Sequence, residues 1–327
     1  MKLNKILIYD GSYLLQRALH TPGLAELCTK DGIKTGGVYG FLKVFQAEIK
    51  RFPDYYPVVC WDGGLSTRRT QIYSDYKANR KRISADNLVA HGIPLPKDDY
   101  LEEYHRQRGV IISILGSMGV TSLLLPKWEG DDLQYLLTLI SNDSVIVSDD
   151  KDMIQLVSPT CRIRRSMRDE LISWNATDTY NHHPRFTIRK AITGDTSDNI
   201  PSVCKGIGEK TADKIAVLLE NTLFDFYKET LEGYIKEKPD DALSPKIQMI
   251  LANWTQFLVN YELINLREVE IPPTFAKIVE EVIVLTSNKI DVFKAYRILG
   301  ENQIEKIYPD QIIRLIVNAK TFLEGVN

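Results

Sequence analysis

The sequence predicts an α/β fold with a mainly parallel β-sheet flanked by helices. Three short apolar runs rich in β-branched residues each end in acid, at Asp10, at Asp62 and at the pair Asp149 and Asp150. Such runs are typical of parallel strands that are buried on both faces. Segments with helical periodicity lie between these runs, and strands that alternate with helices indicate a mainly parallel sheet.

The expected elements follow in chain order. We expect strands at residues 5–9, 57–61, 120–125 and 144–148, and helices at about 36–51, 100–118 and 131–141. A polar and basic stretch at about 63–99 interrupts the pattern, and so long an excursion inside an α/β unit usually has a functional role. After about residue 186 the strand pattern fades, and helical periodicity continues near 186–193, 209–219, 245–259 and 289–298. The sequence therefore predicts an α/β domain over residues 1–185 and a helical region over residues 186–327.

The composition excludes several classes of protein. No apolar stretch reaches the ~18 residues that a membrane span requires, the start of the chain lacks the features of a signal peptide, and the four cysteines are scattered. We therefore expect a cytoplasmic protein, in the host cytoplasm if a phage encodes it, without a zinc site or a disulfide framework. The net charge is −2, but the distribution of charge matters more for nucleic-acid binding than the total. If nine acidic residues are set aside as a metal cluster, 41 basic residues remain against 34 acidic ones.

Nine acidic residues are candidate metal ligands, because they follow the predicted strands or stand in tight pairs. They are Asp10, Asp62, Glu129, Asp131, Asp132, Asp150, Asp152, Asp195 and Asp198. Ligand sites of parallel sheets lie at the carboxyl ends of the strands, and clustered carboxylates that repel one another need a cation. Oxygen ligands suit Mg²⁺ or Mn²⁺, and two such ions can activate water and hold a phosphate. Alternatively, individual acids could cap helices or stabilise turns, and we assign only Asp149 to that role.

A glycine turn near residue 206 is a candidate phosphate site. Gly206 and Gly208 permit a tight turn and a close approach of the backbone, and the N–H groups at the start of the following helix attract anions. Lys205 and Lys210 add positive charge that does not depend on the base sequence.

Six motifs in this order resemble the 5′ nuclease family, which includes bacteriophage 5′→3′ exonucleases, the nuclease domain of bacterial DNA polymerase I and flap endonucleases. The motifs are Asp10-Gly11-Ser12, Trp61-Asp62-Gly63, Tyr76-Lys77-Ala78-Asn79-Arg80, Glu129-Gly130-Asp131-Asp132, Asp150-Lys151-Asp152 and Gly194-Asp195-Thr196-Ser197-Asp198-Asn199-Ile200-Pro201. The resemblance covers about residues 5–220. It implies a PIN-like catalytic domain with a helical arch at about 63–99, and a helix–hairpin–helix variant at about 200–219.

The resemblance also implies roles for single residues. It implies two Mg²⁺ ions, for which Mn²⁺ could substitute, and the nine acids divide between them. Nearest the first ion it places Asp10, Asp62, Glu129, Asp131 and Asp132, and nearest the second Asp150, Asp152, Asp195 and Asp198. Lys77 and Arg80 would contact the scissile phosphate and stabilise its developing charge, and Tyr76 could stack on an unpaired base.

Two further implications concern DNA binding. Arg68 and Arg69 are candidates for a phosphate contact, of which we select Arg68, although both could be exposed arch residues. The hairpin of the family holds duplex DNA and often carries K⁺. Here Ser202 stands in place of a glycine and Cys204 is an extra residue, which bears on the K⁺ geometry.

The implied function is a metal-dependent, structure-specific 5′ nuclease that removes 5′ flaps or RNA primers, with DNA 5′ ends and RNA–DNA hybrids as substrates. The alternatives are a PIN-like ribonuclease, which would be shorter and lack the glycine turn, and a catalytically inactive DNA-binding scaffold, which would not explain why all nine acids are present. The size resembles that of phage replication nucleases, so we expect no polymerase domain. We expect a monomer, with a single-strand-binding protein or a sliding clamp as candidate partners.

Overall fold

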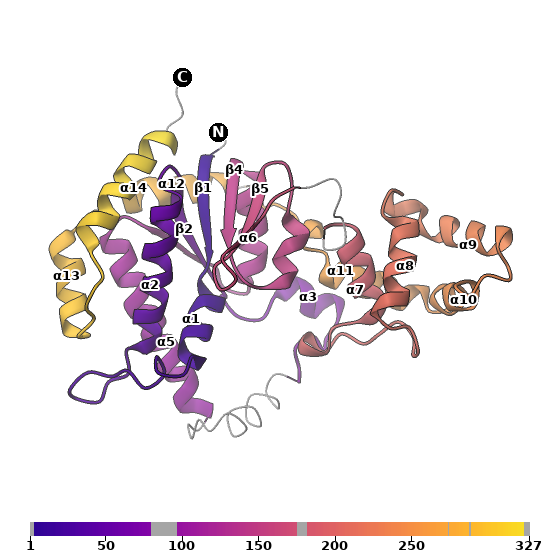
Figure 1. Ribbon diagram of the computed structural model, residues 1–327, viewed down its shortest axis with the longest axis horizontal. Coiled ribbons are helices and arrows are strands. Elements are labelled where there is room, and N and C mark those ends of the chain that lie inside the picture. The colour runs from indigo at the N-terminus through magenta and orange to yellow at the C-terminus, as the bar shows by residue number, and fades with distance from the viewer. Residues whose placement is uncertain (1–2, 80–96, 175–181, 274, 288, 324–327) are drawn as a thin grey trace.

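The structure is a computed structural model of the 327-residue chain, and it describes residues 3–79, 97–174, 182–273, 275–287 and 289–323 (Figure 1). The strands are β1 Leu3–Asp10, β2 Tyr56–Trp61, β3 Thr121–Leu124, β4 Ser141–Val147, β5 Cys161–Arg165 and β6 Glu170–Ile172. The helices up to the glycine turn are α1 Gly11–His20, α2 Gly36–Arg51, α3 Thr67–Ile72, α5 Lys97–Ser117, α6 Gly130–Leu139 and α7 Arg185–Thr193. Those after it are α8 Glu209–Leu219, α9 Tyr227–Glu237, α10 Ser244–Ala252, α11 Trp254–Ile264, α12 Phe275–Ser287, α13 Val292–Glu301 and α14 Pro309–Leu323. Short 3₁₀ turns span Lys151–Leu156, Thr196–Asp198, Phe224–Phe226 and Leu266–Glu268.

The six strands form one sheet in the order β3-β2-β1-β4-β5-β6, parallel except for the antiparallel pair β5–β6. Asp10 lies opposite Cys60 on β2, and Tyr9 lies opposite Val147 on β4. The acids that follow these two neighbouring strands therefore emerge beside Asp10, at one edge of the sheet. The α/β prediction is confirmed.

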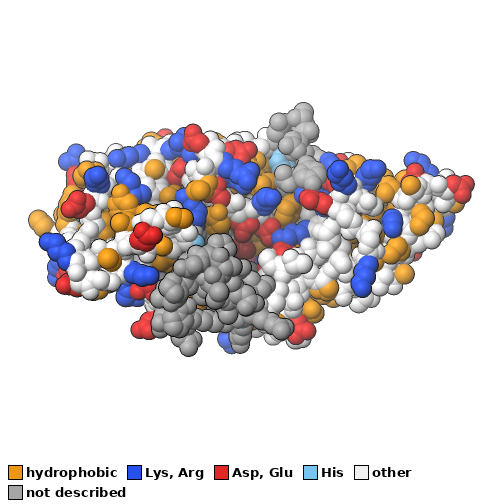
Figure 2. Space-filling model, turned by 60° about the horizontal axis from the view of Figure 1, so that its bottom comes forward, with side chains coloured by type: hydrophobic (Ala, Val, Ile, Leu, Met, Phe, Trp, Pro, Cys, Tyr) orange, Lys and Arg blue, Asp and Glu red, His pale blue; other side chains and the backbone are white. Residues whose placement is uncertain are grey.

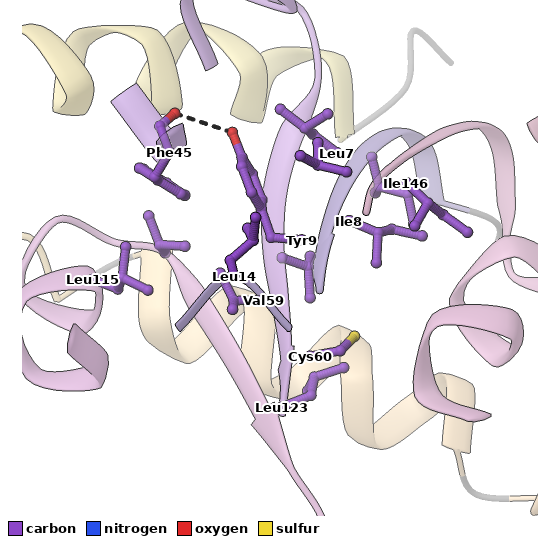
Figure 3. Close-up of a cluster of buried hydrophobic side chains, with 14 of the residues drawn as sticks. Leu7, Ile8, Tyr9, Leu14, Phe45, Val59, Cys60, Leu115, Leu123 and Ile146 are labelled. Carbon is purple, nitrogen blue, oxygen red and sulfur yellow. Dashed lines mark hydrogen bonds between the residues drawn. The ribbon is translucent and has the colours of Figure 1, made fainter. Parts of the chain in front are cut away.

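The centre of the sheet is a continuous apolar core. Leu7, Ile8, Val59 and Ile146 are fully buried (Figure 3), and burying a side chain of this size contributes roughly 1.5–3 kcal/mol. The hydroxyl of Tyr9, next to the last residue of β1, donates a hydrogen bond to the carbonyl of Phe45 at 3.2 Å. The carboxyl edge of the sheet therefore lies against a well-packed core.

The helices after residue 186 contribute to two hydrophobic cores. A second core is built from residues between Ile188 and Ile264, and Tyr76 from the segment before residue 80 packs into it. Beyond it, buried residues from Leu266 to Ala319 join the first core, with α14 packed against β1, β2 and α2, and α13 against α5 (Figure 1). The first core therefore extends beyond the expected boundary at residues 185 and 186, because α12 to α14 return to it.

One predicted helix is divided in two. The helix expected at 245–259 is interrupted at Asn253, where α10 ends and α11 begins. The side-chain amide of Asn253 donates to the carbonyl of Met249 at 2.8 Å, a local bond of the kind that competes with helical hydrogen bonding. None of the helices that the structure describes is both long and apolar enough to span a membrane.

The return of α14 to the first core can be tested on adjacent residues. Ile316 is 1% exposed inside the core, whereas its neighbour Val317 is 47% exposed. We expect Ile316→Ala to lower the free energy of unfolding by about 2–5 kcal/mol, because it leaves a cavity beside the sheet. Val317→Ala, measured in the same urea titration, should change it by less than ~0.5 kcal/mol. Equal effects of the two substitutions would contradict the packing of α14.

Candidate active site

Asp10 and Asp62 stand at the ends of the neighbouring strands β1 and β2, and both also accept backbone hydrogen bonds there. One oxygen of Asp10 accepts the N–H of Tyr13 at 3.0 Å, which caps α1, and the other accepts the hydroxyl of Ser148 at 2.9 Å. Asp62 accepts the N–H of Gly130 at 2.7 Å, which fixes the start of α6 beside β2. The capping role and the site role therefore coexist in the same carboxylates.

A close approach of two loops brings Asp62 next to the motif at residues 129–132. Gly63 exchanges backbone hydrogen bonds with the segment after β3, donating to Trp128 at 2.8 Å and accepting from Lys127 at 3.0 Å. A Cβ at position 63 would lie 1.7 Å from the carbonyl oxygen of Leu125. Only glycine permits this approach, and the approach sets where Glu129 and Asp131 stand.

Four of the nine acids, which we call the uncompensated group, are Asp10, Asp62, Asp131 and Asp150. None of them forms an ion pair with another residue that the structure describes. Burial, followed by the charges of Asp62 and Asp150, raises the pKa of Asp10 to about 7. Burial, followed by Asp150, also raises the pKa of Asp131 far above its usual value, against the opposing charge of Lys77. These carboxylates repel one another across a shared space.

The other five acids form a second group, the paired group, in which each acid forms an ion pair with Arg69, Lys77 or Lys190. Its members are Glu129, Asp132, Asp152, Asp195 and Asp198. Burial alone would raise the pKa of Glu129, but Arg69 and Lys77 outweigh it and hold that pKa below its usual value. This division by charge differs from the division between two ions that the resemblance implies.

Arg69 is the central cation of the paired group. Its guanidinium is 2% exposed, holds both oxygens of Asp132 at 2.8 and 3.0 Å, and reaches Glu129 at 3.0 Å. Its Nε donates to the carbonyl of Leu263 at the end of α11. Arg69 is therefore neither an exposed arch residue nor a phosphate contact, and both oxygens of the candidate ligand Asp132 are occupied by it.

Lys190 neutralises the acids at the other side of the site. Its ammonium on α7 contacts Asp152 and lies 2.7 Å from Asp195. Burial lowers the pKa of Lys190, but the two carboxylates outweigh this effect and raise it. The sequence analysis missed Lys190; its position five residues before Asp195 was the only available signal.

The expectation for Tyr76 is corrected by the structure. Its ring is 3% exposed within the second core, and the cations of Arg69 and Lys77 lie 5.9 and 4.9 Å from its centroid. Its hydroxyl lies 3.1 Å from Glu129 Oε2 and 3.1 Å from Asp198 Oδ2. The ring is enclosed and cannot stack on a base in this conformation.

The basic residues expected at the phosphate fall in different places. Lys77 lies at the site, and its ammonium donates to Glu129 at 2.6 Å. Arg68 donates to the carbonyl of Glu262 and is half-buried, so the structure ties it to α11. Arg80 lies outside the described residues. Asp149 plays the local role assigned to it, because it accepts the N–H of Met167.

One acid of the uncompensated group, Asp131, and three of the paired group, Asp152, Asp195 and Asp198, line one pocket. Tyr76 and Lys190 also form its walls. Figure 2 shows acidic side chains gathered in a hollow in the middle of this face, with basic side chains beside them. Among the described residues, no three His, Cys, Asp or Glu side chains already stand as ligands of a single ion.

The glycine turn lies on the surface of the helical region between α7 and α8. Gly206 has φ +80°, a left-handed conformation that favours glycine, and Gly208 directly precedes α8. A Cβ at position 208 would meet no atom within 4 Å, and one at 206 would meet only the ammonium of Lys246 at 3.8 Å. Lys205 and Lys210 are exposed beside the turn. Lys246, on α10, is a cation that the sequence analysis did not place there.

An acidic pocket at the edge of a parallel sheet, with Lys77 and Lys190 beside its acids, is suited to the hydrolysis of phosphodiesters. A family model described as the N-terminal resolvase-like domain of 5′-3′ exonucleases matches residues 5–184. The 5′-3′ exonuclease of Aquifex aeolicus is 31% identical over 254 residues, which cover 75% of this chain and 81% of that protein. That of Bacillus subtilis is 30% identical over 226 residues, covering 66% and 70%. The chain belongs to the 5′-3′ exonuclease family and is a phosphodiester hydrolase.

More distant relatives agree with this assignment. DNA polymerase I of Streptococcus pneumoniae is 29% identical over 265 residues, which cover 77% of this chain but 28% of the polymerase. The bacteriophage T5 D15 protein co-crystallised with metal ions matches with a TM-score of 0.58 at 20% identity, over 90% of this chain and 99% of that one. The catalytic core of Rad2 in complex with a DNA substrate matches with a TM-score of 0.50 at 11% identity, over 96% and 91%. These structures show that the fold is shared.

Proposed function

We propose that this 5′ nuclease cleaves DNA at 5′ ends and at 5′ flaps, with two divalent cations bound by the acids of the pocket. The uncompensated group carries the proposal. Four carboxylates stand close enough to repel one another, and burial together with the charges of Asp62 and Asp150 raises the pKa of Asp10 to about 7; such carboxylates form a donor set for a hard divalent cation. Metal ions in the T5 D15 crystals and DNA in the Rad2 complex support it.

The donor chemistry fits Mg²⁺ or Mn²⁺ at two places. Asp10, Asp62, Asp131 and Asp150 would hold one ion. Asp198 would contribute to a second, together with Asp152 and Asp195 once Lys190 releases those two. Bound there, the ions would supply an activated water and neutralise charge on the phosphate. Glu129 and Asp132, which are bound by Arg69, would not ligate the first ion directly but would position the residues around it.

The basic side chains have separate tasks in this proposal. Lys77 lies beside the acids and would exchange its contact with Glu129 for one with the scissile phosphate, together with Arg80. The turn at Gly206 and Gly208, with Lys205 and Lys210, would hold the duplex by its phosphates, since an exposed backbone next to a helix start binds anions.

The proposal is tested most directly at Asp131. Asp131→Asn keeps the size of the side chain but removes its charge from the uncompensated group. We expect cleavage of a 5′-flap DNA in Mg²⁺ to fall at least ~10³-fold, while binding of the same DNA in Ca²⁺ stays within about threefold. A variant that cleaves at the parental rate would overturn the assignment, and a parental protein without metal-dependent cleavage would favour the inactive scaffold.

Lys77 should affect the rate more than the affinity. An ammonium that stabilises charge on the phosphate acts most strongly in the transition state, so Lys77→Ala should lower the single-turnover rate by ~10²–10³-fold. The dissociation constant should change by less than about tenfold, or ~1.4 kcal/mol, because other contacts remain. Lys50→Ala, at an exposed lysine of α2, is the matched control and should change neither quantity. Weak binding with an unchanged rate at saturation would show that Lys77 only anchors the DNA.

The role of the glycine turn can be separated from its conformation at position 208. Gly208 has φ −85°, which alanine also adopts, and the space around it is open. Gly208→Ala should therefore fold as the parent does, while its methyl group holds a phosphate away from the backbone and weakens duplex binding about tenfold. Gly233→Ala, within α9 and also in open space, should leave binding unchanged. Equal affinities of both variants would remove the turn from the binding surface.

A further inference from the structure

Two segments that are far apart in the sequence meet at the rim of the pocket. The first comprises residues 73–79, which carry Lys77 and are followed directly by Arg80. The second is the loop of residues 195–200, which carries Asp195 and Asp198 and is closed by reciprocal backbone hydrogen bonds between Asp195 and Ile200 at 2.8 and 2.9 Å. The closed loop gives the two aspartates fixed positions relative to each other, but not relative to Lys77.

Two asparagines join the segments in both directions. The amide of Asn79 donates to the carbonyl of Thr196 at 2.7 Å, and the amide of Asn199 donates to the carbonyl of Asp75 at 2.7 Å. Between these contacts the N–H of Lys77 donates to the carbonyl of Asp198 at 2.8 Å. Each segment thus contributes one side-chain amide to the backbone of the other.

The backbone at the centre of this junction is conformationally demanding. Lys77 has φ +57° and Asn199 has φ +59°, both in the left-handed region that residues with a side chain rarely adopt. Asparagine tolerates this region, but lysine does so at a cost and keeps it only where neighbours impose it. For Lys77, the neighbouring residues that impose this conformation are those of the 195–200 loop, to which residues 77 and 79 are hydrogen-bonded.

We propose that Asn79 and Asn199 form a clasp, and that both are positioning residues for cleavage. The clasp holds Asp195 and Asp198 at a defined distance from Lys77, so that the acids of one segment and the cation of the other act on the same phosphate. The inference rests on the proposed function in assigning Lys77 and the two aspartates to the chemistry. Both asparagines are half-buried, and the two amide contacts described above are made to backbone carbonyls rather than to these charged groups.

A positioning role differs from a structural one in what it should change. Both amide contacts are exposed, where water competes for the same groups, so their net contribution to global stability is small. A misplacement of about 1 Å near the chemistry can nevertheless cost ~10²-fold in rate. Loss of the clasp should therefore lower the rate without lowering the melting temperature.

The test uses Asn79→Ala, Asn199→Gly and the double variant. Glycine at 199 keeps the left-handed backbone and removes only the amide, which alanine would not do. Asn302→Ala is the matched control, because the amide of Asn302 also donates to a carbonyl, that of Ile298 at 2.9 Å, but in α13. Single-turnover cleavage of a 5′-flap DNA, binding of that DNA in Ca²⁺, melting temperature and hydrogen exchange of the segments 73–79 and 195–200 are measured for each protein.

We expect each single variant to cleave at least ~10-fold more slowly, with binding and melting temperature as in the parent. The cleavage rate of the double variant should lie within about threefold of the rate of the slower single variant, because either loss opens the same clasp. Hydrogen exchange should rise across the junction: in residues 195–200 for Asn79→Ala, and in residues 73–79 for Asn199→Gly. The control should match the parent throughout.

Three results would overturn the clasp. These are parental cleavage rates in both single variants, exchange that rises only in the segment that carries the substitution, and slower cleavage that is matched by a fall in melting temperature. Failure of the proposed function would look different. The parent itself would then not cleave, or Lys77→Ala and Asp131→Asn would cleave normally, while the exchange coupling between the two segments would still be observed.

Discussion

The repulsion among carboxylates at the carboxyl edge of the sheet is the constraint on which the rest of this site depends. Parallel strands deliver their acids to one edge, and a buried carboxylate needs a cation or a proton. Arg69, Lys77 and Lys190 form ion pairs with five of the acids, and the other four have no ion-pair partner among the described residues. Some acids of the site are therefore balanced by a protein cation and others are not. An added cation would be held most strongly beside the acids that are not.

Arg69 connects this electrostatic problem to the fold. Its guanidinium joins α6, through Asp132 and Glu129, to the end of α11, through Leu263. Such a planar, always charged group can satisfy several acceptors at once, which an ammonium cannot do with the same geometry. Removing one partner from a buried ion pair typically costs ~3–5 kcal/mol. The residue behind the site thus also binds the sheet domain to the helical region.

The two hydrophobic cores meet at the site, and this arrangement gives the pocket its walls. Tyr76 belongs to the second core, yet its hydroxyl reaches acids that stand on α6 and on the 195–200 loop. Helices α12 to α14 then return to the first core and cover the sheet. A ligand bound in the pocket would contact both cores, because Ile200 and Ile264 of the second core and Leu266 of the first core line it.

The sequence by itself determined strands β1 to β4, the helices α2, α5 and α6 and the positions of the acids along the chain, whereas β5 and β6 were not among the four expected strands. Buried strands such as residues 57–61 are read from local apolar runs, and the edge at which Asp10 and Asp62 emerge follows from parallel pairing. The 5′ nuclease motifs predicted the family, which the match over residues 5–184 confirmed. The tertiary structure alone decided how the charges pair. The burial of Arg69, the enclosure of Tyr76, the bridge made by Lys190 and the return of α14 depend on contacts between segments up to hundreds of residues apart. No local pattern encodes such contacts, because their energies depend on burial and distance, which exist only once the chain is folded.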